Sequence, residues 1–270
     1  MTPALETRVL KISGGALGFG RRWLWRDLNL SLAGGEFLAV LGSNGSGKTS
    51  LLRAILGQQA LDAGDIELAG QPVKRGDRRI GYIPQQRMVA PGTALRGRDL
   101  VTLGVDGHRF GLPVSTPAVR RRVDAAIDSV GALDYANRPM GSLSGGEQQR
   151  LRVAQSVVGD PLLLLCDEPL MSLDLQHQRG VSELIDERRR THGTAVVFVT
   201  HDVNPVLGMV DRLLYLAQGR FTMGTPDEVL RSDVLSDLYQ TPVEVLRSRG
   251  RVFVAGVPEG GVHHHHEEDE

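Results

Sequence analysis

The hydrophobic pattern of the chain predicts three kinds of element: strands exposed on one face, strands buried on both faces, and amphipathic helices. Residues 8–13 and 28–32 alternate apolar with polar side chains, which predicts strands exposed on one face. Gly14 and Gly15 are expected to end the first of these strands. The continuous apolar runs 162–166 and 195–199 predict strands that are buried on both faces, as in a parallel sheet.

Residues 87 to about 158 carry little strand signal and predict a helical insert within the α/β core. Their apolar side chains recur on one helical face, at Val119, Val123, Ala126, Ile127 and Val130. After the last buried strand, residues 212–224 predict a hairpin, 226–240 a helical segment and 243–257 short strands.

A glycine-rich segment lies between the apolar run 37–41 and the helix-like stretch 50–56, and fits the pattern G-x-x-x-x-G-K-[ST]. Its backbone N–H groups and the following helix N-terminus favour a phosphate. Lys48 adds a mobile charge, and the Thr49 hydroxyl is suited to Mg²⁺. A turn that merely contains a lysine is disfavoured, because every pattern position is filled. The predicted contacts are Gly42, Ser43, Asn44, Gly45, Ser46, Gly47, Lys48, Thr49 and Ser50.

Two carboxylates follow the buried run 162–166. Asp167 is expected to hold Mg²⁺, and Glu168 to face an attacking water as a general base. Two acids in an ordinary turn are the alternative if this pair is taken alone.

Residues 143–150 read Leu-Ser-Gly-Gly-Glu-Gln-Gln-Arg and precede an amphipathic helical stretch. Ser144 and Glu147 have the spacing of a capping box, and Gly145 and Gly146 permit close backbone approach. The segment predicts a second helix N-terminus suited to a phosphate, or else simply a well-capped helix.

With these motifs in order, residues 8–240 resemble the ATP-binding subunit of an ABC transporter, and 143–147 match the signature motif of that family. The resemblance implies an α/β phosphate-loop NTPase core with a parallel central sheet, an N-terminal antiparallel β subdomain and an α-helical subdomain over about 87–158. Residues 1–240 form this domain, followed by a short appendage at 241–262. The resemblance also implies an ATPase that binds ATP and Mg²⁺ in a head-to-tail dimer. Each ATP then lies between one phosphate loop and the partner copy's residues 144–147.

The same resemblance assigns further residues to the site. Gln85 matches the glutamine that contacts metal or water, and His201 matches the histidine that senses the γ-phosphate. Asp174 matches the loop that crosses the dimer interface. Phe19 falls at the aromatic position that stacks on adenine, with Trp23 and Trp25 as competitors.

The composition limits the kinds of partner molecule that the chain is expected to bind. Lys and Arg total 31 and Asp and Glu total 32, so the basic excess typical of a nucleic-acid binder is absent and no nucleic-acid partner is expected. The single cysteine, Cys166, suits a reducing compartment. Neither a signal peptide within residues 1–22 nor a membrane-spanning run is visible. Transport therefore requires polytopic permease subunits and predicts a peripheral location on the cytoplasmic face of the cell membrane.

The cargo prediction comes from two short segments, 200–207 and 239–245, which resemble the zinc/manganese importer branch. A substrate-binding protein is then an expected partner. Import of another small solute or metal chelate, or a soluble ABC ATPase without transport, remains an alternative. The tail 263–270 contains only His and acidic residues, is expected to be disordered, and either chelates a transition metal or only solubilises.

Overall fold

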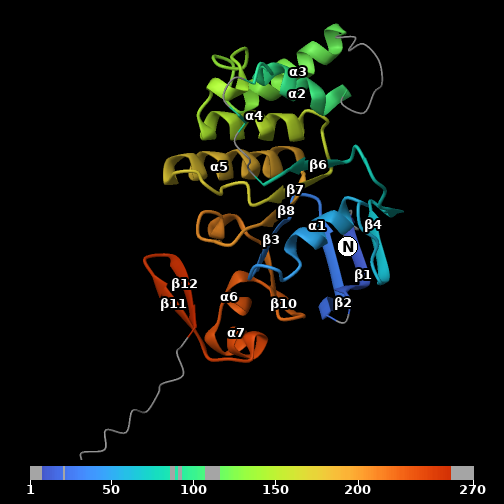
Figure 1. Ribbon diagram of the computed structural model, residues 1–270, viewed down its shortest axis with the longest axis vertical. Coiled ribbons are helices and arrows are strands. Elements are labelled where there is room, and N and C mark those ends of the chain that lie inside the picture. Colours follow the sequence, from blue (N-terminus) through green and yellow to red (C-terminus); the bar gives the residue numbers. More distant parts are fainter. Residues whose placement is uncertain (1–7, 21, 86–88, 91–92, 107–115, 257–270) are drawn as a thin grey trace, which may run out of the picture.

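The computed structural model describes residues 8–20, 22–85, 89–90, 93–106 and 116–256 (Figure 1). The predictions for the tail 263–270 lie outside the described residues, and the predicted 87–158 insert is described only in part.

A six-stranded sheet forms the centre of the molecule, in the order β10-β9-β3-β8-β7-β6. All neighbours pair in parallel except β9 and β10, which form the predicted antiparallel hairpin. Because neighbouring parallel strands end at the same edge, the carboxyl ends of β3, β7 and β8 lie together. The strands are β3 (Phe37–Gly42), β6 (Ile80–Ile83), β7 (Leu163–Asp167), β8 (Ala195–Val199), β9 (Arg212–Ala217) and β10 (Arg220–Gly224).

A second sheet has the order β2-β1-β4-β5 and is antiparallel. The prediction that Gly14 and Gly15 end the first strand is wrong, because β1 continues to Phe19 with register shifts on both sides of the pair. Gly14 takes the left-handed backbone conformation, φ 56°, that such a bulge uses. The strands are β1 (Arg8–Phe19), β2 (Arg22–Ala33), β4 (Ala63–Leu68) and β5 (Gln71–Pro72).

The helices α2, α3 and α4 gather at one end of the molecule, and α5 lies between α4 and the central sheet (Figure 1). In α3, Val123, Ala126 and Ile127 are buried as the apolar periodicity predicts. The elements are α1 (Lys48–Ile55), α2 (Gly97–Asp106), α3 (Pro117–Ser129), the short 3₁₀ helix η1 (Met140–Ser142), α4 (Gly145–Val157) and α5 (Leu175–His192).

The central sheet separates two hydrophobic cores. Leu38 and Val40 belong to the core shared with α1 and the second sheet, whereas Phe37, Ala39 and Leu41 face the core shared with the other helices. This two-sided burial explains the continuous apolar runs in the sequence. Cys166 lies in the second of these cores and is fully buried, and burial raises the pKa of its thiol.

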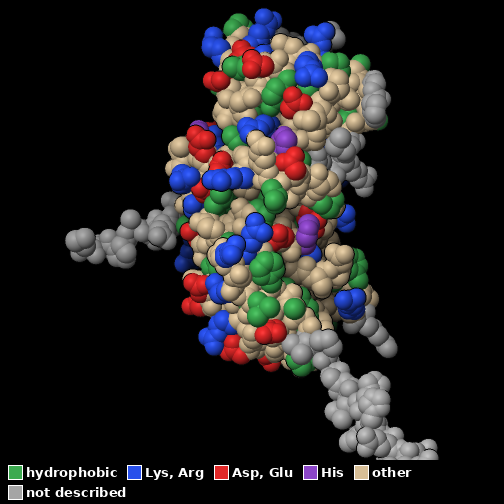
Figure 2. All heavy atoms as spheres, turned by 90° about the vertical axis from the view of Figure 1, so that its left-hand side faces the viewer, with side chains coloured by type: hydrophobic (Ala, Val, Ile, Leu, Met, Phe, Trp, Pro, Cys, Tyr) green, Lys and Arg blue, Asp and Glu red, His purple; other side chains and the backbone are tan. Residues whose placement is uncertain are grey.

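The C-terminal part of the described chain packs on the same side as the helices. The stretch predicted to be helical over 226–240 is two helices, because the backbone at Leu230 leaves the helical region at φ −85° and ψ 66°. A two-stranded hairpin follows, whose Val243 and Val252 are buried in the main core. The elements are η2 (Leu207–Met209), α6 (Pro226–Val229), α7 (Ser232–Tyr239), β11 (Val243–Ser248) and β12 (Arg251–Gly256). On the face that Figure 2 presents, basic and acidic side chains alternate without forming one basic field.

Candidate active site

The phosphate-binding pattern forms the turn between β3 and α1, as the sequence predicts. Two glycines are required there by close packing together with backbone conformation. A Cβ on Gly42 would lie 2.2 Å from the Leu216 carbonyl oxygen, and one on Gly47 would lie 3.1 Å from Trp25 Nε1. Both residues also have positive φ, 151° and 102°. The loop backbone is therefore held against β9 and β2 in a shape that a side chain would prevent.

Lys48, at the start of α1, places its ammonium group inside this loop. Its side-chain Nζ donates hydrogen bonds to the carbonyl oxygens of Gly42, at 2.6 Å, and Ser43, at 3.1 Å. Burial lowers the pKa of Lys48, while the carboxylates of Glu168 and Asp167 act in the opposite direction. The buried Ser46 hydroxyl has no hydrogen-bond partner within the described part of the chain. A phosphate in the loop would give both groups an anionic partner.

Asp167, the last residue of β7, is 5% exposed and accepts a hydrogen bond of 3.3 Å from the Tyr82 hydroxyl. Burial raises the pKa of the Asp167 carboxyl, and neighbouring Glu168 raises it further. Burial, together with Asp167, raises the pKa of Tyr82 to about 12. Tyr82 is a site residue that sequence reasoning missed, since its contact depends on the parallel pairing of β6 with β7.

Glu168 follows at the edge of the sheet with a strained backbone. Its φ of 47° lies in the left-handed region, which is unfavourable for a residue with a side chain. A hydrogen bond of 2.9 Å from Glu168 N–H to the Val199 carbonyl oxygen holds this conformation. Oε2 of the Glu168 carboxylate lies 3.6 Å from Nδ1 of His201. The structure thus brings together the predicted base and the predicted γ-phosphate sensor.

One cavity, with a volume of about 450 Å³, joins the phosphate loop to three residues predicted from other parts of the chain. These are Phe19, Gln85 and Glu168. Phe19 is 61% exposed and free to stack, whereas Trp25 is fully buried and cannot compete with it. The other competitor, Trp23, has the guanidinium of Arg26 4.2 Å from its ring centroid and does not line the cavity.

The residues predicted to hold Mg²⁺ fit that ion. Asp167 is a buried carboxylate next to a second one, an arrangement that a cation stabilises. Thr49 and Gln85 border the cavity and offer a hydroxyl and an amide oxygen, the hard oxygen ligands that Mg²⁺ prefers. Gln85 Nε2 donates to Met171 Sδ at 3.4 Å. Within the described ranges, no three His, Cys, Asp or Glu side chains cluster as a metal site.

The signature segment forms the predicted capping box at the start of α4. Glu147 N–H donates to Ser144 Oγ at 3.3 Å, and Ser144 N–H donates to Glu147 Oε2 at 2.8 Å. None of residues 144–147 lines the cavity around the phosphate loop in this chain. Asp174 caps α5 by accepting a hydrogen bond of 2.9 Å from His177 N–H, and the hydrogen bonds from His177 lower the pKa of Asp174.

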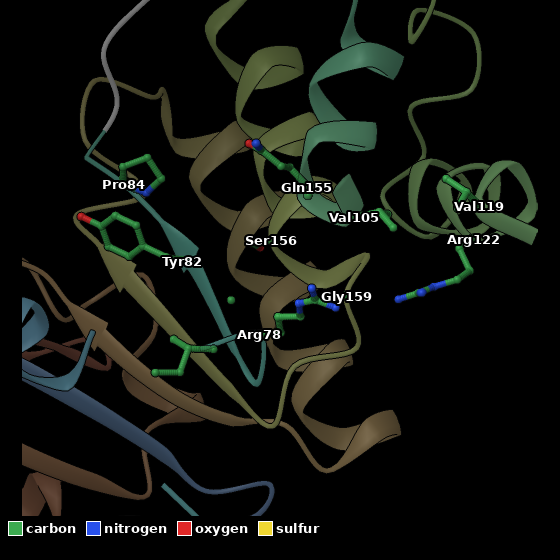
Figure 3. A pocket seen from close by; sticks show the side chains of 12 residues that line it. Arg78, Tyr82, Pro84, Val105, Val119, Arg122, Gln155, Ser156 and Gly159 are labelled. Atoms are coloured by element: carbon green, nitrogen blue, oxygen red, sulfur yellow. The ribbon is translucent and has the colours of Figure 1, made fainter. Parts of the chain in front are cut away.

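A larger cavity, of about 600 Å³, lies between the edge strand β6 and the helices α2, α3 and α4. Figure 3 shows Tyr82 and Pro84 on one side of it and Val105, Val119 and Gln155 on the other. The strand that places Tyr82 beside Asp167 therefore also forms the wall that faces the helical part.

Comparison with known proteins places this geometry in context. The family model described as "ABC transporter" matches residues 25–171. The spermidine/putrescine import ATP-binding protein of Bacteroides fragilis is 32% identical over 84% of this chain and 49% of its own length. The hemin import ATP-binding protein of Nocardia farcinica is 36% identical over 88% of this chain and 82% of its own. The zinc import ATP-binding protein of Cereibacter sphaeroides is 37% identical, with 77% and 78% covered.

Solved structures share the fold. An inward-facing ABC transporter, described as being of a metal-chelate type, matches with a TM-score of 0.77 and 28% identity, covering 93% of this chain and 97% of that one. A dimeric ATP-binding cassette with ADP and Pi, in a post-hydrolysis state, matches with a TM-score of 0.67 and 25% identity over 80% and 98%. The chain spans about half the length of the first curated relatives it matches. Across the described ranges, no helix is both long and apolar enough to cross a bilayer.

Proposed function

Because this chain belongs to the ABC transporter family, we propose that it is an ATP-hydrolysing subunit that powers import of a small solute through partner membrane subunits. The observation that carries the proposal is the edge of the central sheet. There the phosphate loop and Glu168 line one cavity, Asp167 ends β7, and His201 lies 3.6 Å from Glu168. The import functions in the names of several relatives support the direction of transport.

The chain's own residues divide the chemistry among them. The loop N–H groups and Lys48 hold the phosphates, and Phe19 stacks on the adenine. Glu168 takes a proton from the attacking water. His201, whose Nδ1 lies 3.6 Å from Glu168 Oε2, contacts the γ-phosphate beside that water. The strained backbone at Glu168 keeps the carboxylate at the sheet edge rather than in bulk solvent.

Thr49, Gln85 and Asp167 would hold Mg²⁺, which when bound neutralises phosphate charge as it develops. When no cation is bound, burial disfavours the ionised form of Asp167 and raises the pKa of its carboxyl. Tyr82 compensates in part by donating to Asp167 Oδ2.

We propose a head-to-tail dimer as the active form, with residues 144–147 of a second copy completing each site. The absence of these residues from the cavity that surrounds the phosphate loop supports it. Polytopic permease subunits and a substrate-binding protein are the further proposed partners, and the chain acts as a peripheral protein on the cytoplasmic face of the cell membrane.

Glu168→Gln tests the assignment of the base. The variant keeps the size of the side chain and the nucleotide contacts but cannot accept the proton. ATP hydrolysis is expected to fall by roughly a hundredfold or more while ATP affinity is retained. Steady-state phosphate release and equilibrium ATP binding measure the two. Glu187→Gln, on the exposed side of α5, is the matched control. Normal turnover in Glu168→Gln would remove Glu168 from the mechanism.

For the cargo, we propose a divalent metal ion, zinc or manganese. The zinc import relative supports this, but relatives named for polyamine, hemin and sulfonate import share similar identity. An importer ATPase for another solute or a metal chelate is the second candidate, supported by the hemin relative and the metal-chelate transporter.

Uptake measurements in cells with and without the chain separate the two cargo classes. Loss of zinc or manganese uptake supports the first, and loss of hemin uptake with metal uptake intact supports the second. If neither changes, zinc, manganese and hemin are excluded as cargo, while the ATPase proposal stands on the Glu168 test.

A further inference from the structure

His201 is carried by a loop that is internally hydrogen-bonded. Thr200 Oγ1 donates to the Asp202 carbonyl oxygen at 2.8 Å, and Asp202 N–H donates back to Thr200 Oγ1 at 3.2 Å. The Asp202 carboxylate oxygen Oδ1 then accepts from both the backbone N–H and the side-chain Nδ2 of Asn204, at 2.9 and 2.8 Å. These bonds make the loop one unit from Thr200 to Asn204.

Asn204 ties this unit to the C-terminal hairpin. Its Nδ2 donates to the Val252 carbonyl oxygen at 2.9 Å, and Val252 N–H donates to Asn204 Oδ1 at 2.8 Å. The side-chain amide thereby pairs with β12 as a neighbouring peptide group would, across 48 residues of sequence. Val252 is itself 6% exposed and fixed in the main core, so the loop is joined to a firm point.

The side of the loop that carries the histidine has little packing support. A cavity of about 530 Å³ separates it from the hairpin, lined by His201, Asp202, Tyr215, Tyr239 and Phe253 among others. Val203 and Val206 are buried and anchor the residues that follow, but the His201 side chain is 62% exposed. The hydrogen bonds of the loop therefore act together with the buried Val203 to place the exposed His201.

We propose that Asn204 is a positioning residue for ATP hydrolysis, which clamps the His201 loop to β12 so that the hairpin β11–β12 sets the approach of His201 to Glu168. The inference rests on the proposed ATPase function for its kinetic consequence. The clamp itself is a structural claim that can be tested without turnover. Asn204 does not line the cavity at the phosphate loop, and it acts through His201.

Hydrogen–deuterium exchange of the full chain tests the clamp directly. In Asn204→Ala, amides of the loop 200–206 and of β12 are both expected to exchange at least about fivefold faster, because Val252 N–H loses its acceptor and the loop loses its side-chain bonds to β12. Asn29→Ala is the matched control, since Asn29 makes an equivalent pair of side-chain bonds, to Gly14 N–H and the Asp27 carbonyl, in the other sheet. Unchanged exchange at both places in Asn204→Ala would overturn the proposal.

Kinetics then test the consequence. Asn204→Ala is expected to lower kcat by about threefold to tenfold with KM for ATP unchanged, because the groups that hold ATP are not displaced. In a His201→Ala background the same substitution should have no further effect. An additive loss in the double variant would overturn the claim that Asn204 acts through His201.

Asn204→Asp separates hydrogen bonding from size. It keeps the volume of the side chain but puts a carboxylate oxygen against Asp202 Oδ1 and the Val252 carbonyl, so it should be at least as impaired as Asn204→Ala. Activity like that of the unmodified chain would overturn the clamp. A His201→Ala variant that hydrolyses ATP normally would instead count against the proposed function, whatever the exchange result.

Discussion

Asp167 and Glu168 are adjacent carboxylates with different surroundings. Asp167 ends a buried strand and is shielded by Tyr82, whereas Glu168 turns away from the strand into the cavity and faces His201. The strand end therefore separates a residue suited to hold a cation from one suited to accept a proton. The hydrogen bond from Glu168 N–H to the Val199 carbonyl oxygen fixes the backbone at this point.

At this scale, Asp167→Asn is expected to stabilise the apo protein while abolishing Mg²⁺-dependent nucleotide binding. The folded-state pKa of Asp167 is raised, so its favourable contribution is present at low pH and is lost as pH rises through the folded pKa. At pH 7 the ionised group disfavours folding, and the neutral amide removes that effect while still accepting from Tyr82. Without Mg²⁺ or nucleotide, calorimetry should give a Tm higher by roughly 1–3 °C.

The control for this substitution is Asp128→Asn, which changes the same group at an exposed position of α3. Its Tm should not move. A lower Tm for Asp167→Asn would contradict the view that the buried charge is unfavourable in the apo state.

At the scale of elements, two capping boxes of the same geometry occur in the part of the chain that the structure describes. Ser144 and Glu147 begin α4, and Thr225 and Glu228 begin α6, each with reciprocal bonds between cap and third residue. Only the first is proposed to meet a nucleotide. The two caps therefore allow loss of helix stability to be distinguished from loss of function.

Ser144→Ala and Thr225→Ala are each expected to lower the free energy of unfolding by about 1 kcal/mol, since each removes one cap. ATP hydrolysis should fall steeply in Ser144→Ala alone. Urea denaturation and phosphate release measure the two effects. Equal ATPase losses in both variants would mean that Ser144 acts only as a helix cap.

The entry to β6 depends on a pair of charged side chains. Asp77 is almost fully buried, and its carboxylate accepts from Arg79 N–H and Nε at 3.0 Å and from a terminal guanidinium nitrogen at 2.6 Å. The hydrogen bonds from the Arg79 side chain lower the pKa of Asp77. The arrangement fixes the start of the strand that carries Tyr82.

Asp77→Asn is expected to cost about 1–2 kcal/mol of unfolding free energy at pH 7. A depressed folded-state pKa contributes stability above the unfolded pKa, near 4, and the contribution is lost as pH falls through the folded value. The unmodified chain and the variant should therefore converge in acid. Denaturation series at several pH values test this, with Asp227→Asn as the exposed control because its pair with Arg247 is at the surface. A constant difference at all pH values would exclude the ion pair as the cause.

The sequence predicts correctly those elements whose structure depends on residues that are adjacent in the chain. The strand–loop–helix around Lys48 and the capping box at Ser144 follow from adjacent residues, and the structure has both. The course of β1 past Gly14 could not be predicted in this way, because pairing with β2 and β4 overrides the glycines. Tyr82 was missed for a similar reason: its partner Asp167 lies 85 residues away, and only sheet order joins them.

At the scale of the whole molecule, the central sheet places the phosphate loop and the signature segment on different parts of one chain. The loop joins β3 to α1, whereas Ser144 begins α4 at the helical end (Figure 1). This separation supports the proposal that a second copy supplies the signature segment to each nucleotide. The proposed dimer follows from this separation rather than from any exposed apolar face.

Complementation tests the shared site. Glu168→Gln and Ser144→Ala are each expected to be inactive alone. In a mixed dimer, the intact Glu168 of one chain meets the intact Ser144 of the other, so one of two sites is complete. Random pairing of an equimolar mixture should restore up to roughly a quarter of the activity. A mixture no more active than its separate components would contradict a site built from two copies.

The thiol of Cys166, the single cysteine, can report when the core around β7 opens. Cys166 is fully buried one residue before Asp167, and its raised pKa suppresses the reactive thiolate. A thiol reagent can reach the sulfur only when the core between β7 and the helices opens, so the labelling rate counts opening events under native conditions. Ligands held at the end of β7 should slow labelling in proportion to their occupancy. Labelling would thus read out nucleotide binding without an engineered probe.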